Sequence, residues 1–329
     1  RDGLSSSESQ KNYEEIYELT RYLLTTYNGT GKRFFLGHWE GDWALLGSFD
    51  RNLDPTETAI QGMIDWYTIR QRAVDDAKVA TPHENVAVYL YSEVNLVAKA
   101  MEGKPTVTNS VLTQVSVDLV SYSSYDTIFG NTQTFVNALD YIETKAQPKG
   151  DMDRNVFIGE YGFPLYDKNT SGDLVNQRTT PEGQADDTER IYKAAAAWGC
   201  PFVLYWEMYD NEADADGERA RGFWMINNRD EKQPVYFRYQ GYYNRLHAFK
   251  NFYRFWLGRN PDDSAVRSFS NSYDTFSYSN FLNAVVNSGE YASRINNEAF
   301  AGFLLRRLYG VTDPAGDADY SGLVTQQAA

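Results

Sequence analysis

The sequence between residues 11 and 210 alternates between segments with helical spacing and short apolar runs. Apolar residues recur at helical intervals in "YEEIYELTRYLLTTY" and "TETAIQGMIDWYTIRQRAVDDAKVA", and runs such as "RFFLGHW" and "NVFIGEYGF" lie between such segments. The predicted strands are residues 34–39, 86–91, 117–122, 156–160 and 202–206. Strands that alternate with helices form βα units, so the sequence predicts an α/β fold with a mainly parallel sheet.

Polar or aromatic residues stand at the ends of most of these predicted strands. Glu40, Glu93, Glu160 and Trp206 mark four of the five ends. In a parallel α/β barrel, the loops at the carboxyl ends of the strands build the active site. The pattern is therefore typical of an enzyme of the (β/α)8 TIM-barrel type, of which about five βα units are visible in this chain.

The character of the sequence changes after about residue 234, where aromatic-rich helical segments follow one another. We expect a barrel portion over residues 1–240 and a small all-α module over residues 241–329. The module contains a weak internal repeat, because "AFKNFYRFWLGRNPD" (248–262) aligns with "AFAGFLLRRLYGVTDP" (299–314) once one residue is inserted.

Composition narrows the possible partners. The net charge of −14 argues against nucleic acid or an anionic membrane surface as the main partner. No apolar run approaches the roughly 18 residues of a membrane span. One Cys and three His predict neither a disulfide framework nor a His-rich metal centre. We expect no metal and no cofactor. The 25 Tyr, 18 Phe and 7 Trp include residue types that stack on sugar rings and also fill cores.

Two strand ends carry the resemblance to a known family. "FLGHWEGDW" and "FIGEYGFP" are similar to the fourth and seventh strand ends of clan-A glycoside hydrolases, which are (β/α)8 barrels. The resemblance implies that Glu40 is the general acid/base and Glu160 the nucleophile of a retaining glycoside hydrolase. "VDLVSYSSYD" resembles the sixth-strand segment, in which Tyr122 or Tyr125 would contact the nucleophile. "VLYWEMYDNE" resembles the eighth, in which Trp206 would form the floor of a sugar subsite.

The similarity covers roughly residues 11–230 and departs from the clan pattern in two ways. The clan usually has Asn before its acid/base, where this chain has Trp39. Strands one to three have no counterpart, so the visible strands correspond to strands four to eight. The chain begins with "RDGLSSSESQ", without an initiator Met or a signal peptide. We expect a mature or truncated fragment, with the first three strands upstream, in another chain, or absent.

The C-terminal module resembles the phycobilisome-linker-related helical repeats of secreted bacterial proteins, through "FYRFWLGRNPDD", "NSGEYASR" and "LYGVTDPAGDADY". This resemblance implies self-assembly or surface attachment, and a secreted or cell-surface location.

Other residues near the strand ends are candidates for substrate binding. His38, Trp39 and Trp43 flank Glu40 and form either an aromatic platform or packing on the barrel rim. Glu93 and Asn95 could bind sugar hydroxyls or lie in an exposed loop. Trp206 could stack on a sugar or fill the core. Glu207 is expected to point away from Trp206 and to take no part in catalysis.

Two functions from different classes follow. In the first, the protein is a retaining glycoside hydrolase acting on a polysaccharide or oligosaccharide, which needs one protonated and one ionised carboxyl group. In the alternative, Glu40 and Glu160 are solvated strand-end acids, and the protein is a non-catalytic glycan-binding or self-assembling scaffold. The open edges of an incomplete barrel favour this second hypothesis.

Overall fold

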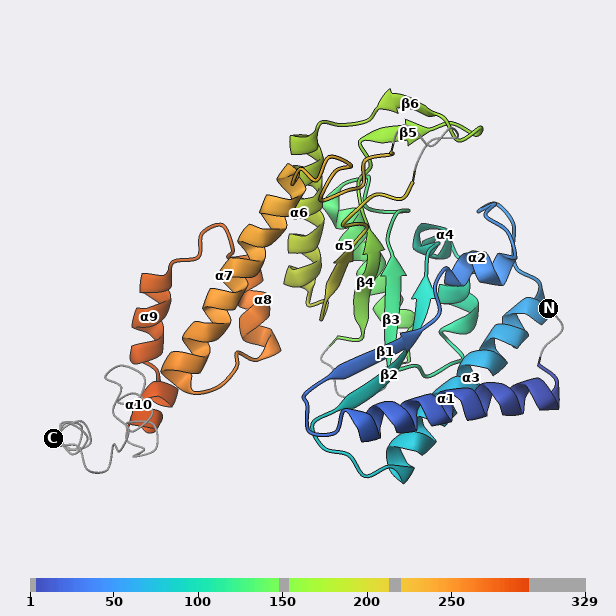
Figure 1. Ribbon diagram of the computed structural model, residues 1–329, viewed down its shortest axis with the longest axis horizontal. Coiled ribbons are helices and arrows are strands. Elements are labelled where there is room, and N and C mark those ends of the chain that lie inside the picture. The colour runs from blue at the N-terminus through green and yellow to red at the C-terminus, as the bar shows by residue number, and fades with distance from the viewer. Residues whose placement is uncertain (1–3, 148–153, 213–219, 296–329) are drawn as a thin grey trace. The chain divides into compact units, whose positions relative to one another are not determined.

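A computed structural model describes residues 4–147, 154–212 and 220–295, and the chain separates into two compact units (Figure 1). The first unit runs from Arg1 to Tyr236 and the second from Phe237 to Ala329. The division falls inside one helix, α7 (Pro234–Leu257), four residues before the expected boundary at residue 240.

The first unit contains a five-stranded parallel sheet in which the strands follow one another in chain order. Its strands are β1 (Arg33–Gly37), β2 (Ala87–Val94), β3 (Leu119–Ser123), β4 (Val156–Tyr161) and β7 (Val203–Tyr205). The predicted α/β fold with five parallel strands is thus confirmed. One element was not predicted, an antiparallel hairpin of β5 (Tyr166–Lys168) and β6 (Leu174–Gln177) that follows β4.

Helices connect the strands and begin at side-chain caps. The long ones are α1 (Ser6–Thr26), α3 (Glu57–Ala80), α5 (Thr132–Lys145) and α6 (Pro181–Trp198). Ser5 and Glu8 form a capping box at α1, while Thr56, Asn131 and Thr180 cap the other three. Short elements are α2 (Gly41–Leu46), α4 (Val97–Met101) and the π-helix η1 (Val107–Val111).

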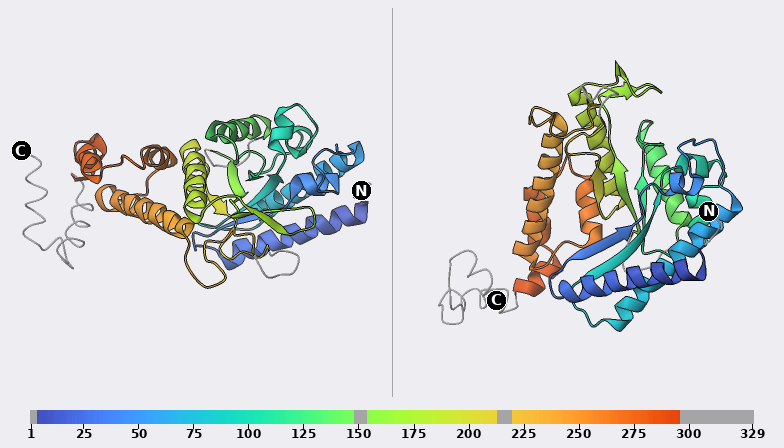
Figure 2. Two further views of the ribbon diagram at one scale, coloured as in Figure 1. Left: turned by 90° about the horizontal axis from the view of Figure 1, so that it is seen from above. Right: turned by 45° about the vertical axis from the view of Figure 1, so that its right-hand side comes forward.

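The two faces of the sheet carry different cores because side chains alternate along each strand. Leu23 and Leu24 of α1 pack with Val88 of β2 on one face, and both views in Figure 2 show α1 beside the β1–β2 edge. The other face carries an aromatic cluster, which we call the floor cluster. Its residues are Phe35, Tyr89, Tyr91, Leu119, Phe157 and Phe202.

The floor cluster shows that the sheet is strongly curled. Phe35 lies on β1 and Phe202 directly precedes β7, so they belong to opposite edges of the sheet. Edges four strand steps apart would stand about 19 Å from each other in a flat sheet. The two ring centroids are nevertheless only 4.8 Å apart. The sheet therefore bends toward itself as in an α/β barrel, and among the described residues no strand joins β1 to β7.

The second unit is helical over its described part, which ends at residue 295. It comprises most of α7, with α8 (Asp263–Asn271), α9 (Tyr278–Val286) and α10 (Gly289–Ile295). Phe249, Phe269 and Val285 belong to its core. The first copy of the predicted repeat covers the end of α7 and the turn to α8, whereas the second copy (299–314) lies outside the described residues. No helix in the described part of either unit is long and apolar enough to cross a membrane.

Candidate functional site

Three carboxyl groups meet at the carboxyl ends of the parallel strands. Glu40 follows β1, while Glu93 and Glu160 lie near the ends of β2 and β4. Burial raises the pKa of Glu40 to about 7, and the charge of Glu160 adds to the shift. Burial also raises the pKa of Glu93 to about 7, with contributions from the charges of Glu160 and Glu40. The Glu40 N–H donates a hydrogen bond to Glu93, and the side chain of the adjacent Trp39 donates one to Glu160, so the three groups belong to one site.

The position of Glu160 depends on an irregularity in the sheet. Tyr122 of β3 pairs with Ile158 of β4, but the next residue, Ser123, pairs with Glu160. Gly159 is the residue skipped, and a Cβ there would lie 1.9 Å from the Ser121 Oγ. Only glycine fits this close approach of backbone to side chain. The glycine in "FIGEYG" thus allows the bulge next to Glu160.

Trp39 contacts Glu160 directly. Its indole Nε1–H donates a hydrogen bond of 3.0 Å to Glu160 Oε2, although the side chain is 62% exposed. The exposed ring faces solvent beside a carboxylate that is itself only 9% exposed. This contact was not predicted, because sequence gives no sign of which way a loop side chain turns.

The two candidate tyrosines have different environments. Tyr122 is fully buried, and its hydroxyl contacts Asp126 Oδ1 at 2.5 Å and Thr127 Oγ1 at 2.6 Å. The prediction that Tyr122 binds substrate is therefore corrected. Tyr125 lies near Glu160: burial first, and then the Glu160 charge, raises the pKa of its hydroxyl. The Tyr125 hydroxyl makes no hydrogen bond of ordinary geometry within the described residues.

Glu40 has an unusual backbone conformation. It lies in the left-handed region, with φ 63° and ψ 47°, and is the N-cap residue of α2. Its N–H donates a 2.6 Å hydrogen bond to Glu93 Oε1. A non-glycine residue in a sparsely populated region costs of order 1–3 kcal/mol. The hydrogen bond to Glu93 offsets part of this cost. Glu40 Oε2 is buried and makes no hydrogen bond within the described residues.

Glu93 holds protein groups instead of facing an open cleft. The side chain is 3% exposed, and Oε2 accepts a 3.0 Å hydrogen bond from Ser121 Oγ. With Oε1 bonded to the Glu40 N–H, both oxygens are occupied. The prediction that Glu93 binds sugar hydroxyls or lies in an exposed loop is corrected. Ser121 was missed because an inward serine in a buried strand looks like ordinary core.

Other residues that flank Glu40 support the loop or line its far side. Asp42 accepts hydrogen bonds from three backbone N–H groups, including that of Asn95, and Asn95 Oδ1 accepts one from the Asp42 N–H. His38 lies edge-on against Trp66 of α3 at 5.3 Å. It also lines a cavity of about 510 Å³ between α2 and α3. Trp43 packs on Phe49, with ring centroids 5.9 Å apart.

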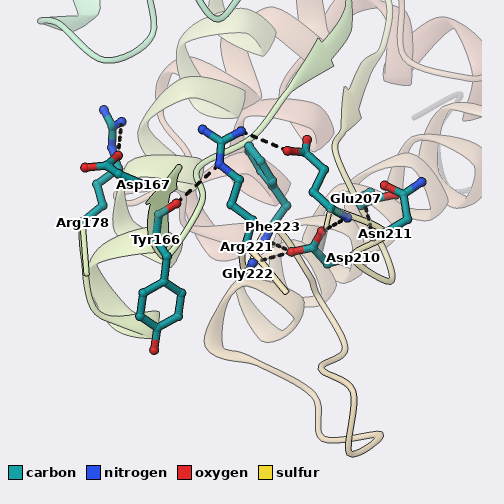
Figure 3. A network of polar contacts seen from close by, with 10 residues as sticks. Tyr166, Asp167, Arg178, Glu207, Asp210, Asn211, Arg221, Gly222 and Phe223 are labelled. Carbon is teal, nitrogen blue, oxygen red and sulfur yellow. Dashed lines mark hydrogen bonds and ion pairs between the residues drawn. The ribbon is translucent and has the colours of Figure 1, made fainter. Parts of the chain in front are cut away.

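The end of β7 carries Trp206 and an acidic loop. Trp206 is half-buried, its backbone N–H donates to the Tyr161 carbonyl at 2.8 Å, and the Trp206–Glu207 peptide is cis. Figure 3 shows Asp210 accepting hydrogen bonds from the backbone N–H groups of Gly222 and Phe223. Arg221 forms an ion pair of 3.0 Å with Glu212. These acids therefore stabilise the loop itself, of which residues 213–219 lie outside the described part.

The described residues contain no cluster of three or more His, Cys, Asp or Glu side chains that could hold a metal ion. Three carboxyl groups lie at the site. Two have a raised pKa, and a third accepts a hydrogen bond from an exposed indole.

No family model matches the chain, and no curated protein matches it. Several solved structures do. A thermostable mutant of a xylanase from Cellvibrio japonicus shares 15% identity over 72% of this chain and 71% of that chain, with a TM-score of 0.43.

A variant GH5_18 protein from Streptomyces cattleya in complex with Manβ1-4GlcNAc matches at 14% identity and a TM-score of 0.47, over 98% of this chain and 72% of that chain. A Bacteroidetes-affiliated GH5 cellulase matches at 15% identity with a TM-score of 0.43, over 86% of this chain and 71% of that chain. These low values assign no role to any residue of this chain. The resemblance of the helical module to phycobilisome-linker repeats finds no support in them and stays a prediction.

Proposed function

We propose that this protein is a retaining glycoside hydrolase, with Glu160 as the nucleophile and Glu40 as the general acid/base. The observation that carries the proposal is that Trp39, the residue directly before Glu40, donates a 3.0 Å hydrogen bond to Glu160, which brings the two glutamates to one strand-end site. The pKa of Glu40 is raised to about 7, partly by the charge of Glu160. Glu160 accepts the Trp39 N–H. Glycoside hydrolysis needs two carboxyl groups with different tasks, one to give a proton and one to attack the sugar.

The first step forms a covalent glycosyl-enzyme. Glu160 Oε2 is bonded to Trp39, so we assign the attack on the anomeric carbon to Oε1. As this bond forms, the bond from the anomeric carbon to the leaving oxygen breaks, and Glu40 gives its proton to that oxygen. In the second step, Glu40 takes a proton from a water molecule. The water oxygen then bonds to the anomeric carbon as the bond from that carbon to Glu160 breaks.

The substrate we propose is a neutral polysaccharide or oligosaccharide. Trp39 offers an exposed aromatic face beside Glu160, and Trp206 offers a half-exposed one at the end of β7. Aromatic faces suit the apolar faces of sugar rings. The net charge of −14 disfavours strongly anionic chains. A secreted or cell-surface location fits a polymeric substrate and stays a prediction.

One observation favours the alternative of a non-catalytic glycan-binding scaffold. Among the described residues, β1 and β7 each have an unpaired edge. Unpaired edges favour association with another chain. Under this alternative the protein would bind glycans and assemble without hydrolysing them.

Azide rescue separates the two functions and the two carboxyl groups. Glu160→Gly is expected to lower hydrolysis of an aryl glycoside by at least about 1,000-fold, since it removes the nucleophile. Added azide should then restore turnover and give a glycosyl azide of inverted configuration, identified by NMR. Glu40→Ala with azide should give the retained configuration. A wild type that binds oligosaccharides and hydrolyses none of a broad panel would support the scaffold instead.

A further inference from the structure

Glu93 is the one carboxyl group of the site that the proposed reaction does not use. It reaches from β2 to both neighbours. Its Oε1 accepts the Glu40 N–H at 2.6 Å, and its Oε2 accepts the Ser121 Oγ–H at 3.0 Å. Ser121 in turn lies against Gly159, where a Cβ would be 1.9 Å from its Oγ. Glu93 thus contacts the backbone of Glu40 and, through Ser121, the segment that carries Glu160.

We propose that Glu93 is the positioning residue of this site: it holds the Glu40 backbone in the conformation that presents the Glu40 side chain as the acid. This inference rests on the proposed function, because it names how the acid/base of that reaction is held. Glu93 acts through Glu40 and does not touch substrate.

The surroundings of Glu93 are unfavourable for a carboxyl group that has no such role. The titratable groups that face it are Glu40 at the start of α2, Glu160 on β4, Tyr67 on α3 and its own strand neighbour Tyr91. Glu93 makes no ion pair within the described residues, and it is 3% exposed. Burying an unpaired carboxyl group among other acids opposes folding. Its two hydrogen bonds offset part of this cost, and both go to groups next to the proposed catalytic residues.

A second contact shows how closely the Glu40 segment fits Glu93. A Cβ on Gly41 would lie 2.0 Å from the Glu93 carbonyl oxygen. The side chain of Glu93 thus binds residue 40 while its main chain touches residue 41. With Glu40 at φ 63°, the start of α2 is fixed by one residue of the neighbouring strand.

The test compares leaving groups. A substrate with a poor leaving group, such as a phenyl glycoside, needs the acid, whereas a 2,4-dinitrophenyl glycoside of the same sugar does not. In Glu93→Ala we expect kcat/KM to fall by about 100-fold for the first substrate and by less than about fivefold for the second. Glu93→Gln keeps an acceptor oxygen for the Glu40 N–H and should stay within about tenfold of wild type on both.

Asp118→Ala is the matched control. Asp118 is also 3% exposed and accepts a backbone N–H from the neighbouring strand, that of Leu90 at 2.8 Å, but it precedes β3 at the far end from the site. We expect this variant to lower activity on both substrates equally, if at all. An equal loss on both substrates in Glu93→Ala would overturn the inference. Should Glu93→Ala not fold, Glu93→Asp, which withdraws the acceptor by one methylene, must show the same dependence on leaving group.

Amide hydrogen exchange measured by NMR gives a readout that does not depend on turnover. The Glu40 amide should be protected in the wild type and in Glu93→Gln, and unprotected in Glu93→Ala. Equal protection in all three would overturn the inference even if the wild type is an active glycosidase. A wild type without hydrolytic activity would overturn the proposed function, and the exchange result would still decide whether Glu93 holds Glu40.

Discussion

Two Trp-Glu pairs stand at the two edges of the sheet, Trp39–Glu40 after β1 and Trp206–Glu207 after β7. In the first, Trp39 donates to Glu160, and Glu40 takes a left-handed conformation with its pKa raised to about 7. In the second, the peptide is cis and Glu207 accepts the Asn211 N–H at 3.1 Å. Burial and neighbouring acids also raise the pKa of Glu207. The same dipeptide is thus directed toward the site at one edge and toward its own loop at the other.

The residue after each pair explains much of the difference. Gly41 lets the chain touch Glu93 and start α2, whereas Met208 continues into a loop held by Asp210. The environment of each Trp-Glu pair therefore depends on the residues that surround it and not on the dipeptide itself. Four experiments test this contrast.

The largest effect is expected at the glutamates. Glu40→Gln should lower kcat/KM on a phenyl glycoside by about 100- to 10,000-fold, because the reaction loses its acid/base. Glu207→Gln, the matched variant at the other edge, should change it by less than about threefold, as its carboxyl group binds its own loop. Steady-state kinetics measure both. Similar losses in the two variants would mean that both pairs serve the reaction.

The next experiment replaces the residue that follows each pair with alanine. Gly41→Ala introduces a Cβ about 2.0 Å from the Glu93 carbonyl. We expect it to lower the free energy of unfolding by about 1–3 kcal/mol. Met208 is 47% exposed, and Met208→Ala should change stability by less than about 0.5 kcal/mol. Urea unfolding gives both values. A stable Gly41→Ala protein would contradict the close contact between Gly41 and Glu93.

A smaller effect is expected at the tryptophans. Trp39→Phe keeps an aromatic face but removes the N–H that binds Glu160, and should lower kcat about tenfold. The Trp206 indole makes no hydrogen bond within the described residues, so Trp206→Phe should change kcat by less than about threefold. Kinetics on one oligosaccharide compare them. If Trp39→Phe raised only KM, its ring and not its N–H would matter.

The smallest expected effect concerns stability and pH. Unfolded Glu40 loses its proton near 4.5, whereas the folded protein keeps it until about pH 7. Between these values the folded state binds more protons, so the free energy of unfolding falls as pH rises from 4.5 to 7. Glu40→Gln should remove part of this fall, by less than about 2 kcal/mol since the group stays half-hydrated. Glu207→Gln should remove less. Urea titrations at pH 5 and pH 8 give the free energy of unfolding at each pH. If the difference between the two values were the same in Glu40→Gln as in the wild type, the prediction would be contradicted.

The strands could be predicted from the sequence because their apolar alternation and flanking helices are local signals. The strand ends followed from the same signals, and the structure places Glu40 directly after the loop that follows β1 and Glu160 at the end of β4, while their roles in catalysis remain predictions. The orientation of residues beyond those ends could not be predicted. The predicted strand 34–39 stops at Gly37, which leaves His38 and Trp39 free of strand alternation.

Tyr122 and Tyr125 illustrate the limit. Tyr122 lies within β3 and is fully buried, whereas Tyr125 lies two residues beyond the strand and approaches Glu160, a difference that the shared apolar run does not reveal. A one-residue shift reverses the face that a strand residue presents. The role of Glu93 was hidden for a related reason, since its partner is a backbone N–H whose direction depends on the φ of Glu40. Hydrogen bonds between a main-chain group and a distant side chain produce no periodic pattern in a sequence, so they cannot be predicted from it.

The ring contact between Phe35 and Phe202 has a mechanical meaning. The contact joins the first strand of the sheet to the segment before the last one, and so limits how far the two edges can move apart. Glu40 follows β1 and Glu160 ends β4, so the span between them depends on the curvature that these rings maintain. Enlarging or trimming either ring would widen or narrow that span without altering any group that reacts.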